Sequence, residues 1–170
     1  MSQPADSSAV DLLERYQNLV WKISHSFAEN DADLDDLRQE ICISLWTAYD
    51  KIPTEAKEFT FVYRVALNRA LSWQRKRRTY LKHLRRFFTT VEPSERRPVD
   101  SASASDLERL YRAVRSLPEL DRSLMLLYLD QQSYAEMADI LGISEAAVGK
   151  RISRAKEALA KNIQRGERTS

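Results

Sequence analysis

The chain has 170 residues, 43% of them hydrophobic and 31% charged, a balance typical of a folded protein rather than a disordered one. Its single cysteine excludes an internal disulfide, and no apolar run approaches the roughly 20 residues that cross a bilayer. Only three glycines and five prolines interrupt the sequence, which favours a mostly helical fold, and the start of the chain lacks a signal peptide, so we expect a protein of the cytoplasm.

Three helical patterns are visible in the N-terminal half. Apolar side chains recur at three- and four-residue steps through the first of them, from Leu12 to Phe27. An acidic stretch then caps a second helix, which Pro53 ends, and a short loop precedes a strongly basic third helix. In chain order we expect a disordered N-terminus at residues 1–10 and helices at about Asp11–Ala28, Leu34–Lys51 and Thr60–Leu84, with a loop at Thr54–Phe59.

Residues 87–105 lose this periodicity and gather proline, serine and charge, which predicts a flexible linker. Beyond it, Ser116 to Glu119 and Ser133 to Glu136 each match a capping box, a pattern that starts a helix. We therefore expect an all-α chain with two small helical domains, 11–86 and 106–163, joined by the linker. The second domain would contain helices at about Asp106–Arg115, Pro118–Asp130, Tyr134–Leu141 and Ser144–Ile163, followed by a frayed tail at 164–170.

Charges of opposite sign are separated along the chain, although the net charge is only +2. Nine acidic residues accompany three basic ones between Glu29 and Glu58, whereas nine basic residues accompany two acidic ones between Arg75 and Arg97. Blocks of opposite sign indicate two different partners, one of which is polyanionic.

The second expected helix carries apolar side chains on two sides. One side is a regular core stripe, and the other has an aliphatic and an aromatic residue that a core does not need. This second side and its acidic flanks consist of Asp35, Asp36, Gln39, Glu40, Ile43 and Trp46. Exposed apolar side chains among acids are typical of a protein-binding hot spot. The alternative is a helix that is buried on both sides in a compact bundle.

The third expected helix combines an inward apolar face, which would include Trp73 and Tyr80, with a polar side. That polar side consists of Arg64, Asn68, Ser72 and Arg75, with Arg78 near its edge. Guanidinium, amide and hydroxyl groups in such a row suit phosphates and base edges. Three aromatic residues nearby would stack on unpaired bases, namely Phe59, Phe61 and Tyr63. The alternative is an ordinary solvated face.

The final expected helix follows a turn, Leu141–Ser144, and has one buried and one polar side. This pattern is typical of a helix-turn-helix whose second helix enters a DNA groove. Small residues at Ala146 and Gly149 would let the DNA backbone come close, and Lys150 and Arg154 would meet guanine edges or phosphates. The outward residues would be Ala146, Lys150, Ser153 and Arg154. A role in protein binding alone is the alternative for such a unit.

Patterns typical of catalysis or metal binding are missing. His25 and His83 lie far apart, and no cysteine or carboxylate stands at metal-ligand spacing from them. The sequence also lacks a glycine-rich phosphate loop and any Ser–His–Asp or Cys–His arrangement, and Cys42 is expected to pack within its helix. We therefore expect no enzymatic activity, no cofactor and no metal site.

The order of these segments resembles an extracytoplasmic-function, or group 4, sigma factor of bacterial RNA polymerase, a member of the sigma-70 family. Asp35–Ile41 with Trp46 is similar to the segment that docks on the clamp helices of the largest polymerase subunit. Phe61–Asn68 and Arg75–Arg78 are similar to the segment that melts and reads the −10 promoter element, and Leu117–Leu159 is similar to the domain that reads the −35 element. The three segments in this order are a highly specific combination.

The resemblance implies a non-enzymatic protein with a sigma-2 domain at 11–86 and a sigma-4 domain at 106–163. These domains would bind the clamp helices and flap of core polymerase, and they would recognise promoter DNA. That DNA would be single-stranded at −10 and duplex at −35, and an anti-sigma factor is a further partner that the resemblance allows. The polymerase-binding residues would be Asp35, Asp36, Gln39, Glu40, Ile43 and Trp46. The −10 DNA-binding residues would be Phe59, Phe61, Arg64, Asn68, Ser72, Arg75, Lys76 and Arg78. The −35 DNA-binding residues would be Ser144, Ala146, Gly149, Lys150, Arg151, Ser153 and Arg154.

The chain departs from the family pattern at several of these positions. Ser72 stands where the family often has aspartate, Phe61 where it often has tryptophan, and Gly149-Lys150 where a basic residue and then serine are usual. Promoter preference is therefore not carried over from relatives. Two alternatives stay open: a helix-turn-helix regulator that never contacts polymerase, and a helical adaptor that sequesters another regulator.

Overall fold

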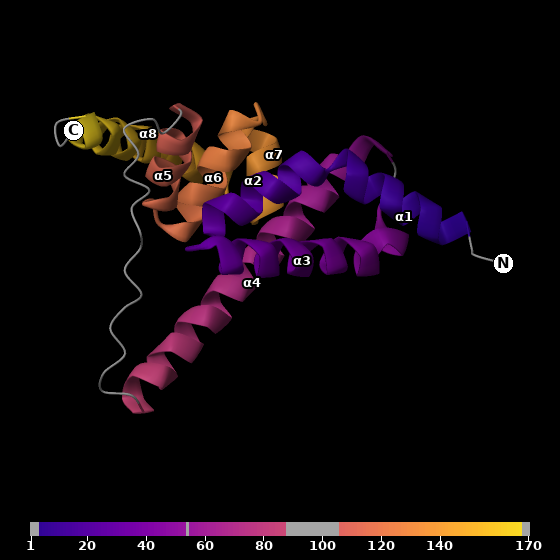
Figure 1. Ribbon diagram of the computed structural model, residues 1–170. Coiled ribbons are helices and arrows are strands. Elements are labelled where there is room, and N and C mark those ends of the chain that lie inside the picture. The colour runs from indigo at the N-terminus through magenta and orange to yellow at the C-terminus, as the bar shows by residue number, and fades with distance from the viewer. Residues whose placement is uncertain (1–3, 54, 88–105, 168–170) are drawn as a thin grey trace. The chain divides into compact units, whose positions relative to one another are not determined.

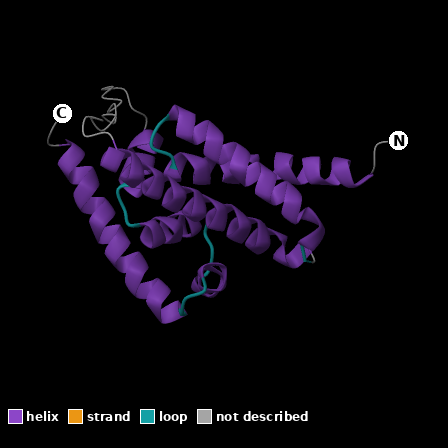
Figure 2. Ribbon diagram, turned by 90° about the horizontal axis from the view of Figure 1, so that it is seen from below, coloured by secondary structure: helices purple, strands orange, loops and turns teal. Residues whose placement is uncertain are grey.

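The computed structural model describes residues 4–53, 55–87 and 106–167. All regular secondary structure within these ranges is helical (Figure 2), so the all-α prediction is confirmed for the described part of the chain. The chain divides into two compact units, Met1–Pro98 and Val99–Ser170, and each is described by itself. None of the described helices is both long and apolar enough to cross a membrane.

In the first unit, α3 packs against both α2 and α4, which are its main neighbours. The described elements are α1 (Pro4–Arg15), α2 (Gln17–Phe27), α3 (Asp31–Ala48), a short 3-10 helix (Tyr49–Lys51) and α4 (Glu55–Phe87). In Figure 1, α4 crosses α3 and then continues beyond it. Apolar side chains from all four α-helices form the core, among them Leu12, Phe27, Leu37, Ile41, Leu45, Val62 and Ala66. Each large one contributes about 1.5–3 kcal/mol when it is fully buried.

The N-terminal helix differs from its prediction at its start and in its middle. The expected disorder of residues 1–10 is wrong from Pro4 onward, because α1 begins there and buries Ala9; proline is tolerated in a first helical turn. Tyr16 then separates α1 from α2, with φ −101° and ψ 11°. The Tyr16 hydroxyl donates a 2.9 Å hydrogen bond to Glu58 on α4. Burial, together with this hydrogen bond, raises the pKa of Tyr16 to about 12.

Helix α4 begins earlier than the sequence predicts. The expected loop at Thr54–Phe59 is wrong from Glu55 onward, and Thr54 lies outside the described residues. The ring of Phe59 lies 5.4 Å from that of Tyr63, one helical turn later, and 6.3 Å from that of Tyr16. These aromatic contacts, and a glutamate near the positive end of the helix dipole, favour helix where the sequence alone indicates a loop.

In the second unit, α6 and α7 both pack against α8. The described helices are α5 (Asp106–Arg115), α6 (Glu119–Leu129), α7 (Tyr134–Leu141) and α8 (Glu145–Glu167). The predicted capping box at the start of α7 is confirmed: Ser133 Oγ accepts a 3.2 Å hydrogen bond from the backbone N–H of Glu136, whose carboxylate accepts one of 2.8 Å from the N–H of Ser133. Gly142, at φ 68°, then ends α7 in the left-handed conformation that glycine favours.

The second predicted capping box, Ser116–Glu119, is wrong. A proline occupies the position before α6 and offers no side-chain acceptor, while the Ser116 hydroxyl donates a 2.6 Å hydrogen bond to the carbonyl of Ala113. The buried Arg122 instead joins α6 to the end of α5. Its Nη2 donates hydrogen bonds to the carbonyl oxygens of Arg115 and Leu117, at 2.6 and 3.0 Å. A long side chain from within the helix thus satisfies carbonyls that the preceding helix leaves open.

Two helices continue past the ends that the sequence predicts. Helix α4 reaches Phe87 rather than Leu84, and α8 reaches Glu167 although the sequence predicts a frayed tail at 164–170. The strong helix formers at Ala158–Lys161 and the lack of a following proline favour the longer α8. Apart from Phe87, the expected linker lies outside the described residues.

Candidate functional site

The outer face of α3 exposes two large apolar side chains. Ile43 is 62% exposed and Trp46 is 43% exposed, and Gln39 beside them is exposed as well. The opposite face of the same helix is sealed in the core, where Leu37 and Leu45 are buried. The alternative of a helix buried on both sides is therefore wrong.

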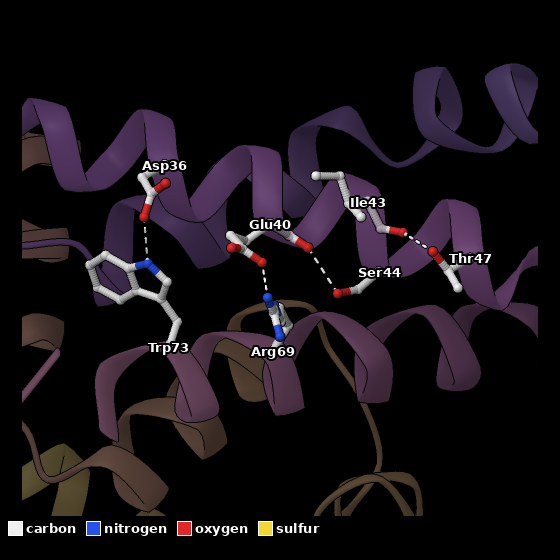
Figure 3. A network of polar contacts seen from close by, with 7 residues as sticks. All are labelled: Asp36, Glu40, Ile43, Ser44, Thr47, Arg69 and Trp73. Carbon is white, nitrogen blue, oxygen red and sulfur yellow. Dashed lines mark hydrogen bonds and ion pairs between the residues drawn. The ribbon is translucent and has the colours of Figure 1, made fainter. Parts of the chain in front are cut away.

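A shallow groove of about 360 Å³ lies next to this face, where α3 meets α4. The hydroxyls of Ser44 and Thr47 in its lining donate 2.8 Å hydrogen bonds to backbone carbonyls one turn earlier on α3 (Figure 3). Because these hydroxyls are already paired, the lining offers carbon-rich surface beside Ile43. The residues that line the groove are Ile43, Ser44, Thr47, Ala48, Lys51 and Arg69.

The acidic side chains of α3 contact α4 in a regular series. The indole Nε1 of Trp73 donates a 2.8 Å hydrogen bond to Asp36, and one turn along α3 the carboxylate of Glu40 pairs with the guanidinium of Arg69 (Figure 3). Near the start of α3, Arg77 Nη1 lies 2.5 Å from Asp33 Oδ1. We call these three contacts the α3–α4 ladder, with rungs Asp33–Arg77, Asp36–Trp73 and Glu40–Arg69.

The ladder corrects the predicted acidic flank of the exposed face. Asp36 and Glu40 point toward α4 in the structure (Figure 3), because the facing helix supplies an indole N–H and a guanidinium at matching positions. Asp35 pairs with Arg38 on α3 itself, at 3.0 Å. Of the predicted set, Asp35, Asp36, Gln39, Ile43 and Trp46 are exposed and Glu40 is half-buried.

Asp33 is buried, at 6% exposure, and forms the innermost rung. Burial raises the pKa of its carboxyl, and the charge of Arg77 offsets this only in part. Arg77 also lies over the ring of Trp73, 5.5 Å from its centroid, which links two rungs. A buried ion pair of this kind contributes little net stability, yet breaking it is costly. Removing either partner alone would therefore be costly, because the other charge would stay buried without compensation.

The polar side of α4 is only partly as the sequence predicts. Asn68 is exposed, whereas Arg64 and Ser72 are half-buried. The exposed cations of the predicted −10 set are Arg75, Lys76 and Arg78. Amide and cationic groups spread over about three turns of one helix suit phosphate contacts.

The aromatic residues of α4 differ most from prediction. Tyr63 is fully buried, so it is not available to stack on a base. Phe59 and Phe61 are half-buried, and Phe59 packs against Tyr63 within the unit. Tyr80, which the sequence places inward, is 63% exposed, because α4 has by then continued beyond α3 (Figure 1).

Helix α8 presents most of its predicted polar side to solvent. The hydroxyl of Ser144 accepts a 3.2 Å hydrogen bond from the backbone N–H of Ala147 and so caps the helix. Val148 and Ile152 are buried and attach α8 to its unit. The predicted outward residues that are exposed are Ala146, Lys150, Ser153 and Arg154.

Two predicted −35 contacts face the unit's own helices instead. Gly149 is half-buried, and a Cβ added to it would lie 3.5 Å from the ring of Tyr134 on α7, an ordinary contact distance. Arg151 Nη1 lies 2.7 Å from Asp121 Oδ1 on α6. Both corrections arise because α8 packs between neighbours on two sides, which the pattern of one helix does not reveal.

Sequence reasoning missed the α4 half of the ladder and a contact on α8. Arg69, Trp73 and Arg77 recur every four residues, and this spacing opposite a row of acids was the available signal. Lys156 Nζ lies 3.9 Å from the ring centroid of Tyr128, a cation–π contact that withdraws one α8 cation from the basic side.

Groups suited to bond chemistry are not assembled in the part of the chain that the structure describes. No three His, Cys, Asp or Glu side chains there could hold a metal ion together. Cys42 is half-buried, and burial raises the pKa of its thiol, which disfavours the reactive thiolate. His25 stacks on Trp21 with ring centroids 4.7 Å apart.

Two family models match the chain: Sigma-70 region 2 matches residues 12–80, and Sigma-70, region 4 matches residues 107–159. The ECF RNA polymerase sigma-E factor of Escherichia coli strain K12 is 30% identical, over 95% of this chain and 90% of that protein. The ECF RNA polymerase sigma factor SigW of Bacillus subtilis is 24% identical, over 91% of this chain and 88% of that protein.

Two solved structures share the fold. The sigma factor RpoE of Bartonella quintana, in complex with the anti-sigma factor NepR, has a TM-score of 0.70 at 19% identity, and covers 89% of this chain and 94% of its own. CnrH, in complex with the cytosolic domain of CnrY, has a TM-score of 0.63 at 22% identity, with coverage of 94% and 89%. The chain therefore belongs to the extracytoplasmic-function sigma factors of the sigma-70 family. It directs RNA polymerase to promoters, and the alternative of a regulator that acts without polymerase is not favoured.

Proposed function

We propose that this sigma factor divides its work among three surfaces. The outer face of α3 binds core polymerase, the polar side of α4 contacts the −10 element, and the exposed side of α8 contacts the −35 element. The first two surfaces belong to a domain at 11–86 and the third to a domain at 106–163. The chain supplies binding energy in the cytoplasm and catalyses no reaction itself.

The docking surface is the exposed face of Gln39, Ile43 and Trp46 together with the adjoining groove. A large aromatic anchor next to an aliphatic side chain is the composition of an interface hot spot. By resemblance, the partner is the clamp-helix segment of the largest polymerase subunit. The second domain would contact the polymerase flap, and it exposes Leu129 and Tyr128 as apolar surface for this role.

At the −10 element, α4 would hold unpaired DNA. Extruding a base from the duplex costs a few kcal/mol, which contacts between exposed cations and the displaced strand would offset. Asn68 provides an exposed amide for a base edge. Of the three aromatic residues predicted to stack, Tyr63 is buried and Phe59 packs against it, so we assign base stacking to the half-buried Phe61.

At the −35 element, α8 would enter the major groove with its first turns. Ala146 lies on the exposed side and lets the helix approach closely, while Lys150 and Arg154 project toward phosphates or guanine edges. Gly149 and Arg151 are left out of this surface because they contact α7 and α6.

The observation that carries the proposal is the exposure of Ile43 and Trp46 on a helix whose other face is fully buried. The test is transcription in vitro with purified core polymerase, with and without the chain, followed by mapping of start sites across genomic DNA. We expect discrete start sites that share two upstream elements. If the chain binds DNA but never changes where core polymerase starts, the proposal is wrong.

An anti-sigma factor would inhibit this protein by covering the same α3 face, because polymerase docking needs it free. The fold neighbour from Bartonella quintana was solved with such a factor. Hydrogen exchange of the α3 amides, measured with core polymerase and with any co-purified inhibitor, tests whether the two occupy one surface. Protection of different helices by the two partners would contradict this assignment.

A further inference from the structure

Side chains from the junction of α1 and α2 hold the first turn of α4. Arg15 Nη1 and the Tyr16 hydroxyl donate hydrogen bonds of 2.6 and 2.9 Å to the same carboxylate oxygen, Oε1 of Glu58. The next residue in the chain is Phe59, whose ring lies 6.3 Å from that of Tyr16 and 5.4 Å from that of the buried Tyr63. We call Arg15, Tyr16 and Glu58 the Glu58 cluster.

Within the Glu58 cluster, the hydrogen bond from Tyr16 is better shielded from water than the ion pair with Arg15. The side chain of Glu58 is 16% exposed and that of Arg15 is 58% exposed, whereas Tyr16 is half-buried. Because the pKa of Tyr16 is raised to about 12, its hydroxyl keeps its proton and remains a donor at neutral pH. Hydrogen bonds to a charged acceptor are stronger than neutral ones, and exposed ion pairs contribute little. Tyr16 is therefore the main partner of Glu58.

The start of α4 needs such a partner. The helix begins at Glu55, and the first turn of any helix has backbone N–H groups without partners inside the helix, so helix ends tend to fray. Glu58 stands in this first turn. Its partner Tyr16 belongs to a continuous backbone, because hydrogen bonds of 3.0 Å link it to Leu12 before it and to Val20 after it. The Glu58 cluster thus ties a helix end to a firmly held part of the unit.

Helical spacing connects the Glu58 cluster with the DNA-facing side of α4. Phe61 and Asn68 are seven residues apart and so lie on one side of the helix, away from the buried Val62 and Ala66. Glu58 precedes Phe61 by three residues, which makes the two neighbours on the helix surface. A shift of the first turn would therefore displace Phe61 and change its position relative to Asn68, which lies two turns further along.

We propose that Arg15, Tyr16 and Glu58 are positioning residues for recognition of the −10 element. They hold the first turns of α4 so that Phe61 and Asn68 meet one extruded base together. The three residues act through the start of α4 and not by contact with the base. The inference rests on the proposed function, since it presupposes that Phe61 stacks on a base of the −10 element.

Binding of the holoenzyme to single-stranded −10 DNA tests this assignment. The probes are fluorescent oligonucleotides from a mapped start site, one intact and the others with an abasic site at each −10 position in turn. Phe61→Ala identifies the captured base. This variant should bind the intact oligonucleotide more weakly and should have no further effect when the abasic site replaces the base that Phe61 contacts.

Tyr16→Phe keeps the ring against Phe59 and removes only the hydroxyl. We expect it to weaken binding to the intact oligonucleotide by about threefold or more, the effect of one lost hydrogen bond. Binding to the oligonucleotide that lacks the captured base should not change. Glu58→Ala should behave in the same way, and combining the two substitutions should add little, because both remove one contact. Affinity for core polymerase should be unchanged, since neither residue lies on α3.

Two milder variants keep the test informative if Glu58→Ala folds poorly. Glu58→Gln retains an oxygen that accepts from Tyr16, so we expect it to bind the intact oligonucleotide within about twofold of the original protein. Arg15→Met removes the exposed ion pair and should have a smaller effect than Tyr16→Phe.

A matched control is available in the core of the same unit. Ile23 on α2 is fully buried, and Ile23→Val removes a methylene from it without altering the Glu58 cluster. This variant should lower the unfolding temperature and leave binding to the intact oligonucleotide unchanged. The control separates a general loss of stability from a loss of position.

Two outcomes would overturn the positioning role. One is equal weakening by Tyr16→Phe on the intact and the abasic oligonucleotides, which a general loss of structure would produce. The other is the original affinity for the intact oligonucleotide in both Tyr16→Phe and Glu58→Ala. Failure of the proposed function looks different: the unmodified holoenzyme would bind the −10 oligonucleotide no better than a scrambled sequence, or Phe61→Ala would bind it normally.

Discussion

Arg151 on α8 lies 2.7 Å from Asp121 on α6, measured between Nη1 and Oδ1, whereas Arg154, one turn further along the same helix, is exposed. Two arginines in the same basic segment therefore have different surroundings. The first joins two helices of its own unit, and the second projects from the side that we expect to enter DNA.

This difference makes the two arginines a matched pair. We expect Arg154→Ala to weaken binding to a duplex −35 element by about 1–3 kcal/mol, the value of one good base contact, and to leave thermal unfolding unchanged. Arg151→Ala should lower the unfolding temperature and have the smaller effect on DNA affinity. Fluorescence anisotropy and a thermal melt measure the two effects. Full −35 binding by Arg154→Ala would show that the DNA-reading side of α8 is misplaced.

Gly149 is expected to tolerate a small side chain. An added Cβ would meet the Tyr134 ring at 3.5 Å, an ordinary contact distance, and alanine is about 1 kcal/mol more favourable than glycine inside a helix. Gly149→Ala should therefore raise the free energy of unfolding of the second unit by up to about 1 kcal/mol and preserve −35 binding. Chemical denaturation and DNA titration check this. A large loss of DNA affinity would mean that the backbone here approaches DNA closely, as the sequence alone indicates.

The capping box of α7 should make the second unit sensitive to acid. Hydrogen bonds from the side chain and backbone of Ser133 lower the pKa of Glu136 from its ordinary value of 4.5. Because the pKa of Glu136 is lower in the folded state, its ionised carboxylate stabilises the fold above about pH 4.5. This contribution to the free energy of unfolding is lost as the pH falls through the lower pKa of the folded state. Glu136→Gln should therefore melt below the original protein at neutral pH and converge with it in acid, once Glu136 is protonated in the folded state as well. A constant difference between the two proteins at all pH values would contradict this origin.

The hydroxyl of the same capping box gives a pH-independent companion test. Ser133→Ala removes the acceptor for the Glu136 N–H and should cost about 1 kcal/mol of unfolding free energy. Ser153 is an exposed serine on α8 of the same unit, so Ser153→Ala is a suitable control. Equal losses of unfolding free energy in the two variants would contradict a capping role for the Ser133 hydroxyl.

Helix boundaries were predictable where a local signal sets them. Helix α7 matches its prediction at both ends, because the Ser133 capping box and Gly142 act within a few residues of the chain. The break at Tyr16 and the early start of α4 depend instead on contacts between these two places, which lie more than 40 positions apart in the chain. These contacts are the hydrogen bond from Tyr16 to Glu58 and the packing of Tyr16 against Phe59. Such contacts leave no periodic trace in the sequence.

The candidate site also has one part that the sequence predicts and another that depends on contacts between helices. Exposure of Ile43 and Trp46 followed from the helical spacing of α3 alone. The engagement of Asp36 and Glu40 did not, since it depends on which residues of α4 stand opposite them. Tyr80 shows the opposite case: its helical spacing places it inward, but it is 63% exposed, because none of the residues that the structure describes covers it.

The most direct test of the account measures the affinity of purified core polymerase for the labelled chain and for its Trp46→Ala variant. Val10→Ala is the control, because Val10 is 41% exposed and lies on α1 rather than on α3. We expect Trp46→Ala to bind at least about tenfold more weakly, as for a hot-spot aromatic residue, and the control to bind like the original protein. Equal affinities for all three proteins would contradict the proposed docking of α3 on polymerase.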